Sequence, residues 1–266
     1  MERLFHQQEW QGIRLHGLSR VPETPVVGRH FYDTFYQRLL QGEPALSPAW
    51  LEGKRRVPQW LATTWFAARP PQARLRVLSV GAGLGIVERE LWDQGYAVDA
   101  LECNEPAVRY LAEQCPGLPV TLGDARALPY QDARFDVVYL ATVDYCFDRA
   151  DYVRVLREMR RVLRARGVAL SVCASNLSWP TWLRVCALEA LRGTRSEHAR
   201  DISQVPWGYQ RSVGEHVRAG RTAGLACRGV YLFDQRAQVK ARRGAGAWHL
   251  AWPTWRDDLV AVVFSA

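Results

Sequence analysis

The 266-residue chain lacks several features that would each define a class of protein. No run of eighteen apolar residues is present, which argues against a membrane-spanning helix and a membrane partner. The opening MERLFHQQEW has no apolar core of a secretory signal, so we expect a cytoplasmic protein. The six cysteines are scattered and form no C-x-x-C pair, which favours reduced thiols over disulfides or zinc. We therefore expect no metal site.

Lysine is also scarce, since Lys54 and Lys240 are the only lysines in a chain of net charge +8. An arginine-rich, basic chain can bind nucleic acid or an acidic substrate. However, arginines such as Arg154, Arg157 and Arg161 are interleaved with leucine and valine, a pattern typical of a solvated helix face. Nucleic acid is therefore the less favoured partner, and a small molecule the more favoured one.

The segment Arg76–Glu105, RVLSVGAGLGIVERELWDQGYAVDALECNE, organises the rest of the chain. It contains a short apolar strand at 77–80, a glycine-rich turn, a helix from Ile86, and a second strand at 97–101. Glycines let the backbone turn sharply and approach a ligand closely. The amino terminus of the following helix offers N–H groups to a negatively charged ligand group. This order predicts a nucleoside-binding βαβ unit.

The spacing of Gly81, Gly83 and Gly85 discriminates between ligands. A dinucleotide fingerprint is G-x-G-x-x-G, and Ile86 stands where its third glycine would be, so a nicotinamide oxidoreductase is disfavoured. Glu102, 21 residues after Gly81, ends the second strand, where a carboxylate can accept hydrogen bonds from both ribose hydroxyls. This acid favours a nucleoside site over an ordinary tight turn.

The G-x-G-x-G turn resembles motif I of the class I S-adenosylmethionine-dependent methyltransferases. A second string, GDARALPY at Gly123–Tyr130 followed by FDVV from Phe135, is similar to the third and fourth strands of that family. The resemblance is strong over residues 70–176 and weak over 211–266. It implies S-adenosylmethionine as cofactor, with S-adenosylhomocysteine as product.

The resemblance implies an α/β, doubly wound, mostly parallel seven-stranded sheet of the Rossmann-like methyltransferase fold. The alternating pattern of strands and helices predicts the same parallel core. We expect a helical cap in residues 1–70, in which 1–28 are largely loop, and a core at 71–266 with a substrate-side insertion at 177–210. The predicted strands are 77–80, 97–101, 118–122, 136–140, 168–173, 230–233 and 259–264, and the predicted helices include 105–114, 149–163 and 211–225. The last two strands should form an antiparallel hairpin at the edge, and 240–255 a basic surface excursion.

Several positions match the cofactor site of the family. The family's acid at Asp124 bonds the adenine amine, a donor that needs an acceptor, and the backbone at Ala125 reads another ring edge. The family usually has an acid at Ser79, which orders the glycine loop and can approach the methionine amino group. Serine carries no charge, so either cofactor binding is weaker or another acid takes this role. The full predicted cofactor set is Ser79, Gly81, Ala82, Gly83, Gly85, Glu102, Cys103, Asp124, Ala125 and Leu140.

By similarity, a substrate atom attacks the sulfonium methyl in line, while the protein positions the two partners. A hydroxyl nucleophile would also need a general base. The candidates are Asp144 and Tyr145 after the fourth strand and His198 in the insertion, whereas we expect His216, in a predicted helix, to be structural. Aromatic residues could wall an apolar substrate pocket. They are Tyr32, Tyr36, Trp179, Trp182, Trp207 and Tyr209.

The favoured hypothesis is methyl transfer to an O or N atom of a small molecule, such as a secondary metabolite or sugar-like precursor. A tRNA or rRNA methyltransferase is the alternative that the charge supports, although the chain has ATVDY after the fourth strand and no Asn-Pro-Pro-Tyr-like string. A non-catalytic binding or scaffold protein is the alternative that Ser79 supports. We expect a monomer or a homodimer.

Overall fold

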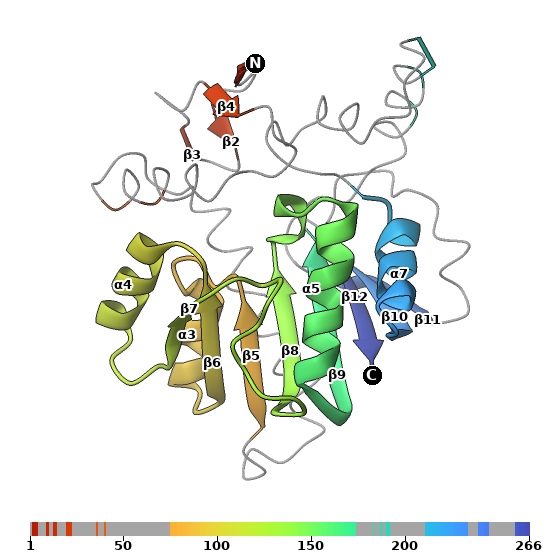
Figure 1. Cartoon of the computed structure of the whole chain (residues 1–266). Helices are drawn as coiled ribbons and strands as arrows, with labels where there is room; N and C mark the ends of the chain where they lie inside the picture. Colours follow the sequence, from red (N-terminus) through yellow and green to blue (C-terminus); the bar gives the residue numbers. More distant parts are fainter. Residues whose placement is uncertain are drawn as a thin grey trace.

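The structure, a computed structural model, describes residues 75–173, 211–233, 239–244 and 259–266, with short stretches elsewhere. Those stretches are 2–4, 9–10, 13–14, 20–22 and positions 36, 40, 183, 187, 190 and 191. One eight-stranded sheet has the strand order β11-β10-β12-β9-β8-β5-β6-β7, with helices on both of its faces (Figure 1).

The half of the sheet formed by β9, β8, β5, β6 and β7 is parallel throughout. Its strands are β5 (Arg76–Val80), β6 (Ala97–Glu102), β7 (Val120–Leu122), β8 (Phe135–Ala141) and β9 (Leu163–Cys173). In β5, every residue after Arg76 is buried, as expected for a parallel strand covered on both faces. The carboxyl ends of these strands meet at one edge, where such sheets bind ligands.

Two helices cover each face of this sheet. The helices α3 (Ile86–Asp93) and α4 (Glu105–Gln114) pack on one face through Val87, Leu91 and Leu111. The opposite face is covered by α5 (Arg149–Val162) and α7 (Val213–Thr222), which contribute Tyr152, Leu156 and Val217. This two-sided burial is the doubly wound arrangement predicted from the sequence.

Local signals explain where the second pair of helices begins. The Asp148 side chain caps α5 by accepting the N–H of Asp151. A capping box opens α7, with the Ser212 and Glu215 side chains each accepting the other residue's backbone N–H. The predicted helix at 211–225 is therefore present over a shorter range, because Gly224 at φ 82 follows its last turn.

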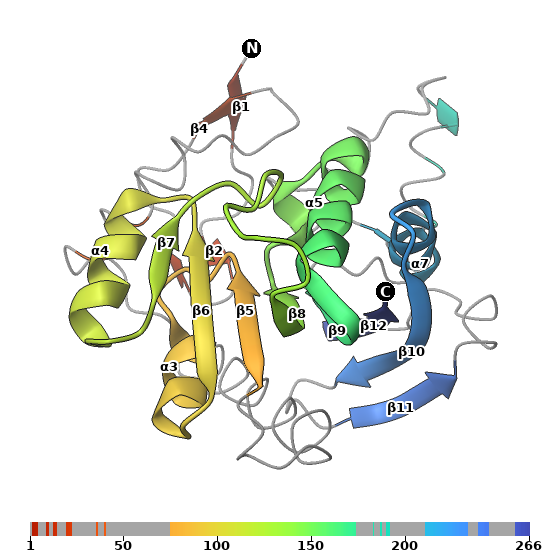
Figure 2. The same ribbon diagram turned by 60° about the horizontal axis from the view of Figure 1, so that its bottom comes forward.

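The other half of the sheet is antiparallel. The strand β12 (Leu259–Ser265) lies between β9 and β10 (Ala226–Phe233), so the predicted antiparallel pair is confirmed. An eighth strand, β11 (Val239–Gly244), pairs with β10 at the edge of the sheet (Figure 2). The prediction of a surface excursion from residue 240 was wrong for this strand, whose sequence VKARRG alternates between apolar and charged residues only over its first four positions.

The boundary between α5 and β9 also differs from the prediction. Leu163, expected as the end of the helix, is the first residue of β9. The strand partners of β8 then jump from Leu163 to Val168, so the predicted turn is a bulge inside a longer strand. Arg166 in this bulge has φ 70, in the left-handed region, where a glycine would be less strained.

The first residues form short strands rather than the loop predicted for 1–28. The strand β1 (Glu2–Leu4) pairs with β4 (Arg20–Pro22), and β2 (Glu9–Trp10) with β3 (Ile13–Arg14). Positions 36 and 40, within the expected cap, are helical. Most of residues 1–70 and 177–210 lie outside the described residues, so the domain boundaries remain predictions. Among the helices that the structure describes, none is long and apolar enough to cross a membrane.

Candidate functional site

The glycine turn joins β5 to α3 at the carboxyl edge of the sheet. Gly81, Gly83 and Gly85 have φ angles of 78°, 58° and 73°, in the left-handed region that favours glycine. The backbone N–H groups of Gly81 and Ala82 donate to the carbonyl oxygen of Leu101 at 2.8 Å and 3.0 Å. The turn is therefore attached to the end of β6.

Glu102, the last residue of β6, is buried beside this turn with 3% of its surface exposed. Its Oε1 accepts the backbone N–H groups of Cys103 at 2.7 Å and Asn104 at 3.0 Å, and also Asn104 Nδ2 at 2.6 Å. Its Oε2 accepts the N–H of Gly83 at 2.8 Å. A carboxylate oxygen accepts about two hydrogen bonds in good geometry, so Oε2 keeps one acceptor position. The Glu102 carboxylate is therefore fixed by the glycine turn and by the two residues that follow Glu102, and it holds these backbone segments together in turn.

A second buried carboxylate lies on the other side of the glycine turn. Glu88, in the first turn of α3, accepts the hydroxyl protons of Ser79 and Tyr139 on Oε1, both at 2.6 Å. Ser79 and Tyr139 are register partners on β5 and β8. Distances of 2.6 Å are typical of hydroxyls bonded to an ionised carboxylate. Burial and then the charge of Glu88 raise the pKa of Tyr139 well above its usual range, so this phenol remains a donor.

Glu88 therefore brings a carboxylate to the position where the sequence has Ser79 in place of the family's acid. Glu88 is not among the site residues predicted from the sequence. The sequence feature that could have identified Glu88 is its position: it is an acid in the first turn of a helix, three residues after Gly85 and next to the apolar Val87.

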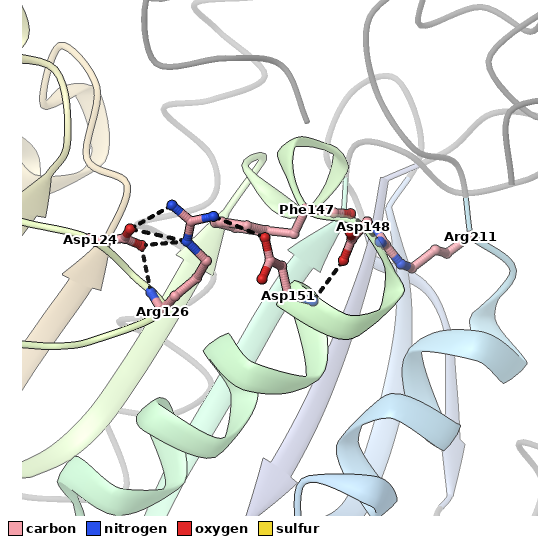
Figure 3. Close-up of polar contacts among 6 residues, drawn as sticks. All are labelled: Asp124, Arg126, Phe147, Asp148, Asp151 and Arg211. Carbon is pink, nitrogen blue, oxygen red and sulfur yellow. Dashed lines mark hydrogen bonds and ion pairs between the residues drawn. The ribbon is translucent and has the colours of Figure 1, made fainter. Parts of the chain in front are cut away.

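Asp124 follows β7 and is bonded by Arg126 (Figure 3). Its Oδ1 accepts the backbone N–H of Arg126 at 2.8 Å, and its Oδ2 accepts Arg126 Nη2 at 2.7 Å. The same guanidinium reaches Asp151 on α5 through Nη1, at 3.0 Å. The hydrogen bonds from Arg126 hold the pKa of the Asp124 carboxyl below its usual range. This carboxylate is ionised and 46% exposed, so a ligand can reach it.

The remaining predicted cofactor residues differ in exposure. Cys103 is exposed next to Glu102, whereas Ala82 and Ala125 are buried at 6% and 8% exposure. Leu140 is fully buried in the core beneath α5 and α7, so its side chain packs inside the protein. Any contact of Leu140 with a ligand would involve its backbone.

Asp144 begins the short 3-10 helix η3 (Asp144–Cys146) after β8 and is fully buried. Its Oδ2 lies 3.9 Å from Nε2 of His216 on α7, which is also fully buried. His216 Nδ1 and the Tyr152 hydroxyl are 2.9 Å apart, and that hydroxyl lies 2.9 Å from Ser171 Oγ. Burial, followed by the charge of Arg211, lowers the pKa of His216 well below its usual range. His216 is therefore a neutral imidazole at pH 7.

Arg211 joins the start of α7 to the turn after β8 (Figure 3). Its guanidinium lies over the Tyr152 ring, 4.6 Å from the centroid. It donates to the carbonyl oxygen of Asp144 at 2.8 Å and to that of Phe147. Arg211 is not among the site residues predicted from the sequence, although it directly precedes the capping serine Ser212.

Tyr36 reaches the glycine turn from the N-terminal segment, since a Cβ added at Gly83 would lie 2.9 Å from its hydroxyl oxygen. Tyr145 belongs to η3, and its side chain is not among the described ones. The other predicted catalytic and substrate residues lie outside the described residues. They are His198, Tyr32, Trp179, Trp182, Trp207 and Tyr209. In the part of the chain that the structure describes, no group of three or more His, Cys, Asp or Glu could hold a metal ion.

These groups fit the chemistry of S-adenosylmethionine. Its ribose hydroxyls, adenine amine and ammonium group are all donors, and the carboxyl edge offers the acceptors Glu102, Asp124 and Glu88. A side chain at Gly83 would meet the hydroxyl of Tyr36, so glycine keeps this space open. The residues present can therefore hold the cofactor.

Comparison with known proteins agrees with the geometry. A family model described as a methyltransferase domain matches residues 78–171. A probable phthiotriol/phenolphthiotriol dimycocerosates methyltransferase 2 of Mycobacterium ulcerans is 30% identical over 126 residues, which cover 44% of this chain and 47% of that protein. The chain thus spans about half the length of this relative. A demethylmenaquinone methyltransferase of Streptomyces griseus is 27% identical over 198 residues, or 73% of this chain and 76% of the relative.

A solved structure shares the fold. It is a Thermotoga maritima S-adenosylmethionine-dependent methyltransferase, described as a possible histamine N-methyltransferase, with a TM-score of 0.57 at 17% identity. The match covers 89% of this chain and 98% of that one. Residues 78–171 therefore match a methyltransferase domain, and the chain shares its fold with a solved S-adenosylmethionine-dependent methyltransferase.

Proposed function

We propose that this protein catalyses methyl transfer from S-adenosylmethionine to an O or N atom of a small molecule. The observation that carries the proposal is the buried Glu102 carboxylate, fixed beside the glycine turn at the carboxyl end of β6. Asp124 follows the neighbouring parallel strand β7, so both acids stand at the ligand-binding edge of the sheet.

Each acid would accept hydrogen bonds from a different group of the cofactor. Glu102 would accept from the ribose and Asp124 from the adenine amine. The family usually has an acid where this chain has Ser79, and Glu88 would perform the role of that acid. It would order the glycine turn and place negative charge near the methionine ammonium group. When bound, the cofactor supplies the electrophilic methyl group. The chain's own contribution is to bind and orient, which can account for most of the rate enhancement of such a transfer.

The buried pair of Asp144 and His216 has a positioning role in this proposal. Neither side chain is exposed, and the backbone of Asp144 is held by Arg211. We therefore assign Asp144 to holding the turn after β8, where the substrate would lie, rather than to the general-base role expected from the sequence. A base for a hydroxyl substrate would then come from another group.

The ion pairs of the described arginines count against the nucleic-acid alternative. Arg134 pairs with Asp99, and Arg164 with Asp136, each through contacts of 2.8 to 3.0 Å. Arg161 likewise pairs with both Asp132 and Glu158. Arginines committed to internal pairs are less available to phosphates. The names of the two relatives, which refer to phthiotriol/phenolphthiotriol dimycocerosates and demethylmenaquinone, support a small-molecule substrate.

Calorimetric titration with S-adenosylmethionine and S-adenosylhomocysteine tests the cofactor site first. We expect both to bind, and radiolabelled methyl to appear in fractions of a small-molecule extract rather than in RNA. Label in RNA would replace the small-molecule proposal with the nucleic-acid one. Binding without transfer to any fraction would favour a scaffold protein, and absence of binding would overturn the cofactor site itself.

A further inference from the structure

Asn104 occupies the N-cap position of α4 but does not cap the helix. Its backbone is extended, at φ −103° and ψ 115°, and its side chain makes no capping hydrogen bond. A capping asparagine normally accepts an N–H of the second or third helical residue. In α4 the second helical residue is Pro106, which has no N–H. The N–H of the third residue, Ala107, is therefore the one that Asn104 could cap. The Asn104 amide is turned instead toward Glu102, to which Nδ2 donates at 2.6 Å.

The oxygen of the same amide is buried without a partner. Asn104 is 3% exposed, and its Oδ1 makes no hydrogen bond. The orientation of the amide is determined by Glu102, because an ionised carboxylate only accepts and so must face the NH₂ group. A buried acceptor without a donor is destabilising, and it calls for an explanation outside the folded chain.

We propose that Asn104 Oδ1 accepts one ribose hydroxyl of the cofactor, while Glu102 Oε2 accepts the other. Oε1 of Glu102 already accepts three hydrogen bonds from protein groups, and Oε2 accepts one. Two vicinal hydroxyls need two acceptors, and the end of β6 offers them on residues two positions apart. The inference rests on the proposed function. It assigns the recognition of one ribose hydroxyl to Asn104, whose side chain does not cap α4.

The test is calorimetric titration of S-adenosylhomocysteine and its 2′-deoxy and 3′-deoxy analogues into wild type, Asn104→Ser and Glu105→Gln. Serine keeps a capping oxygen that can accept the N–H of Ala107 but is too short to replace the amide. Glu105 is the exposed neighbour, with 54% of its side chain accessible, and serves as the matched control. Thermal unfolding of each ligand-free protein provides a readout that is independent of the cofactor.

We expect each deoxy analogue to bind wild type about tenfold more weakly than the parent compound, as for the loss of one hydrogen bond. Asn104→Ser should bind the parent compound more weakly by a similar factor, and in this variant the penalty for one of the two analogues should disappear. The melting temperature of Asn104→Ser should equal or exceed that of wild type, because its helix is capped. Glu105→Gln should behave as wild type.

Two results would overturn the inference while leaving the proposed function intact. One is an Asn104→Ser variant that binds the parent compound but keeps both deoxy penalties. The other is a melting temperature several degrees lower, about the effect of 1 kcal/mol, which would show that Asn104 is needed to hold Glu102. Failure of wild type to bind the parent compound would refute the proposed function, and this inference with it.

Discussion

Buried and half-exposed polar groups at the carboxyl edge of this sheet are stabilised in different ways. Glu102 and Glu88 are 3% and 2% exposed, and their bonds come from backbone N–H groups, an amide and hydroxyls. Asp124, on the loop after β7, is 46% exposed and paired with Arg126, which also binds Asp151 on α5. The two buried glutamates are therefore stabilised by packing and internal hydrogen bonds, whereas Asp124 is stabilised by its ion pair with Arg126.

This difference predicts which part of the site is formed before the ligand arrives. A buried carboxylate with four N–H bonds cannot move without leaving several buried donors unpaired, so the ribose end is preorganised. A half-exposed ion pair contributes little to stability and can rearrange. The adenine end can therefore adjust as Asp124 exchanges part of its contact with Arg126 for the ligand.

Glu102→Ala should have the largest effect, because it leaves the buried N–H groups of Gly83 and Asn104, and the N–H of the more exposed Cys103, without their acceptor. We expect the free energy of unfolding to fall by about 2–3 kcal/mol and S-adenosylhomocysteine binding to be lost. Urea denaturation and calorimetry measure the two effects. Glu105→Ala, which changes the next acid along the chain, an exposed one, is the control. Stability equal to wild type in Glu102→Ala would contradict the view that packing holds this end.

The buried histidine predicts a pH dependence of stability. His216 faces Asp144, Tyr152 and Arg211, and its pKa in the folded protein lies below the ordinary value. Below about pH 6.5 the unfolded chain therefore binds a proton that the folded protein excludes. The contribution of His216 to stability is complete above that pH and decreases by up to about 1.4 kcal/mol per unit as the pH falls.

His216→Gln, which keeps a group able to bond the Tyr152 hydroxyl, should flatten this decline. Urea denaturation at about pH 7.5 and about pH 5.5 measures it in both proteins. Asp124 provides a contrast, since its lowered pKa affects stability only in more acidic solution, as the carboxylate is protonated. Equal losses of stability in wild type and His216→Gln would show that His216 does not cause the decline.

Glu88→Gln tests whether Glu88 on α3 performs the role of the acid that the family usually has at the position of Ser79. We expect S-adenosylhomocysteine to bind about fivefold more weakly, a loss of about 1 kcal/mol from one charge-assisted interaction. Binding of 5′-methylthioadenosine, which lacks the amino-acid part, should be unchanged. The double variant Ser79→Asp/Glu88→Ala, which returns the acid to β5, should recover part of the affinity.

Equal weakening of both ligands by Glu88→Gln would mean that Glu88 orders the turn without acting on the methionine end. Arg89→Gln changes a neighbouring charge on the same helix and serves as the control. Its effect on either ligand should be small, because Arg89 is exposed.

Arg126→Ala should have the smallest effect on stability, below about 1 kcal/mol, because its ion pairs are partly exposed. The freed Asp124 should bind S-adenosylhomocysteine up to about fivefold more tightly. In about 1 M salt, where the screening length is about 3 Å, wild type and variant should converge. A large loss of stability in Arg126→Ala would contradict the contrast between the two kinds of acid.

Local patterns predicted most of the fold. The seven strands and the helices on both faces follow from apolar runs, helical spacing and the glycines at the ends of elements. The exceptions are β11, a basic edge strand held by backbone pairing, and the bulge in β9, where Arg166 has φ 70. In both segments the apolar alternation extends over only four residues and is dominated by charged side chains, so it is a weak signal for a strand.

The candidate site was only partly predictable. Glu102 and Asp124 follow strand ends in recognisable strings, so their chain positions were enough to identify them. Glu88, Arg126 and Arg211 were missed because their partners lie on other elements. Arg126 bonds Asp151 25 residues away, and Arg211 bonds Asp144 67 residues away.

The order of elements, the glycine turn and the family resemblance are properties of short stretches of chain, because backbone preference and burial pattern are local. Which carboxylates are buried, which are paired with arginine, and which amide oxygen lacks a partner depend on how distant stretches pack. Ser79 illustrates the difference. In the sequence it is a missing acid, whereas in the folded protein the packing of α3 against β5 and β8 brings the carboxylate of Glu88 to its side chain.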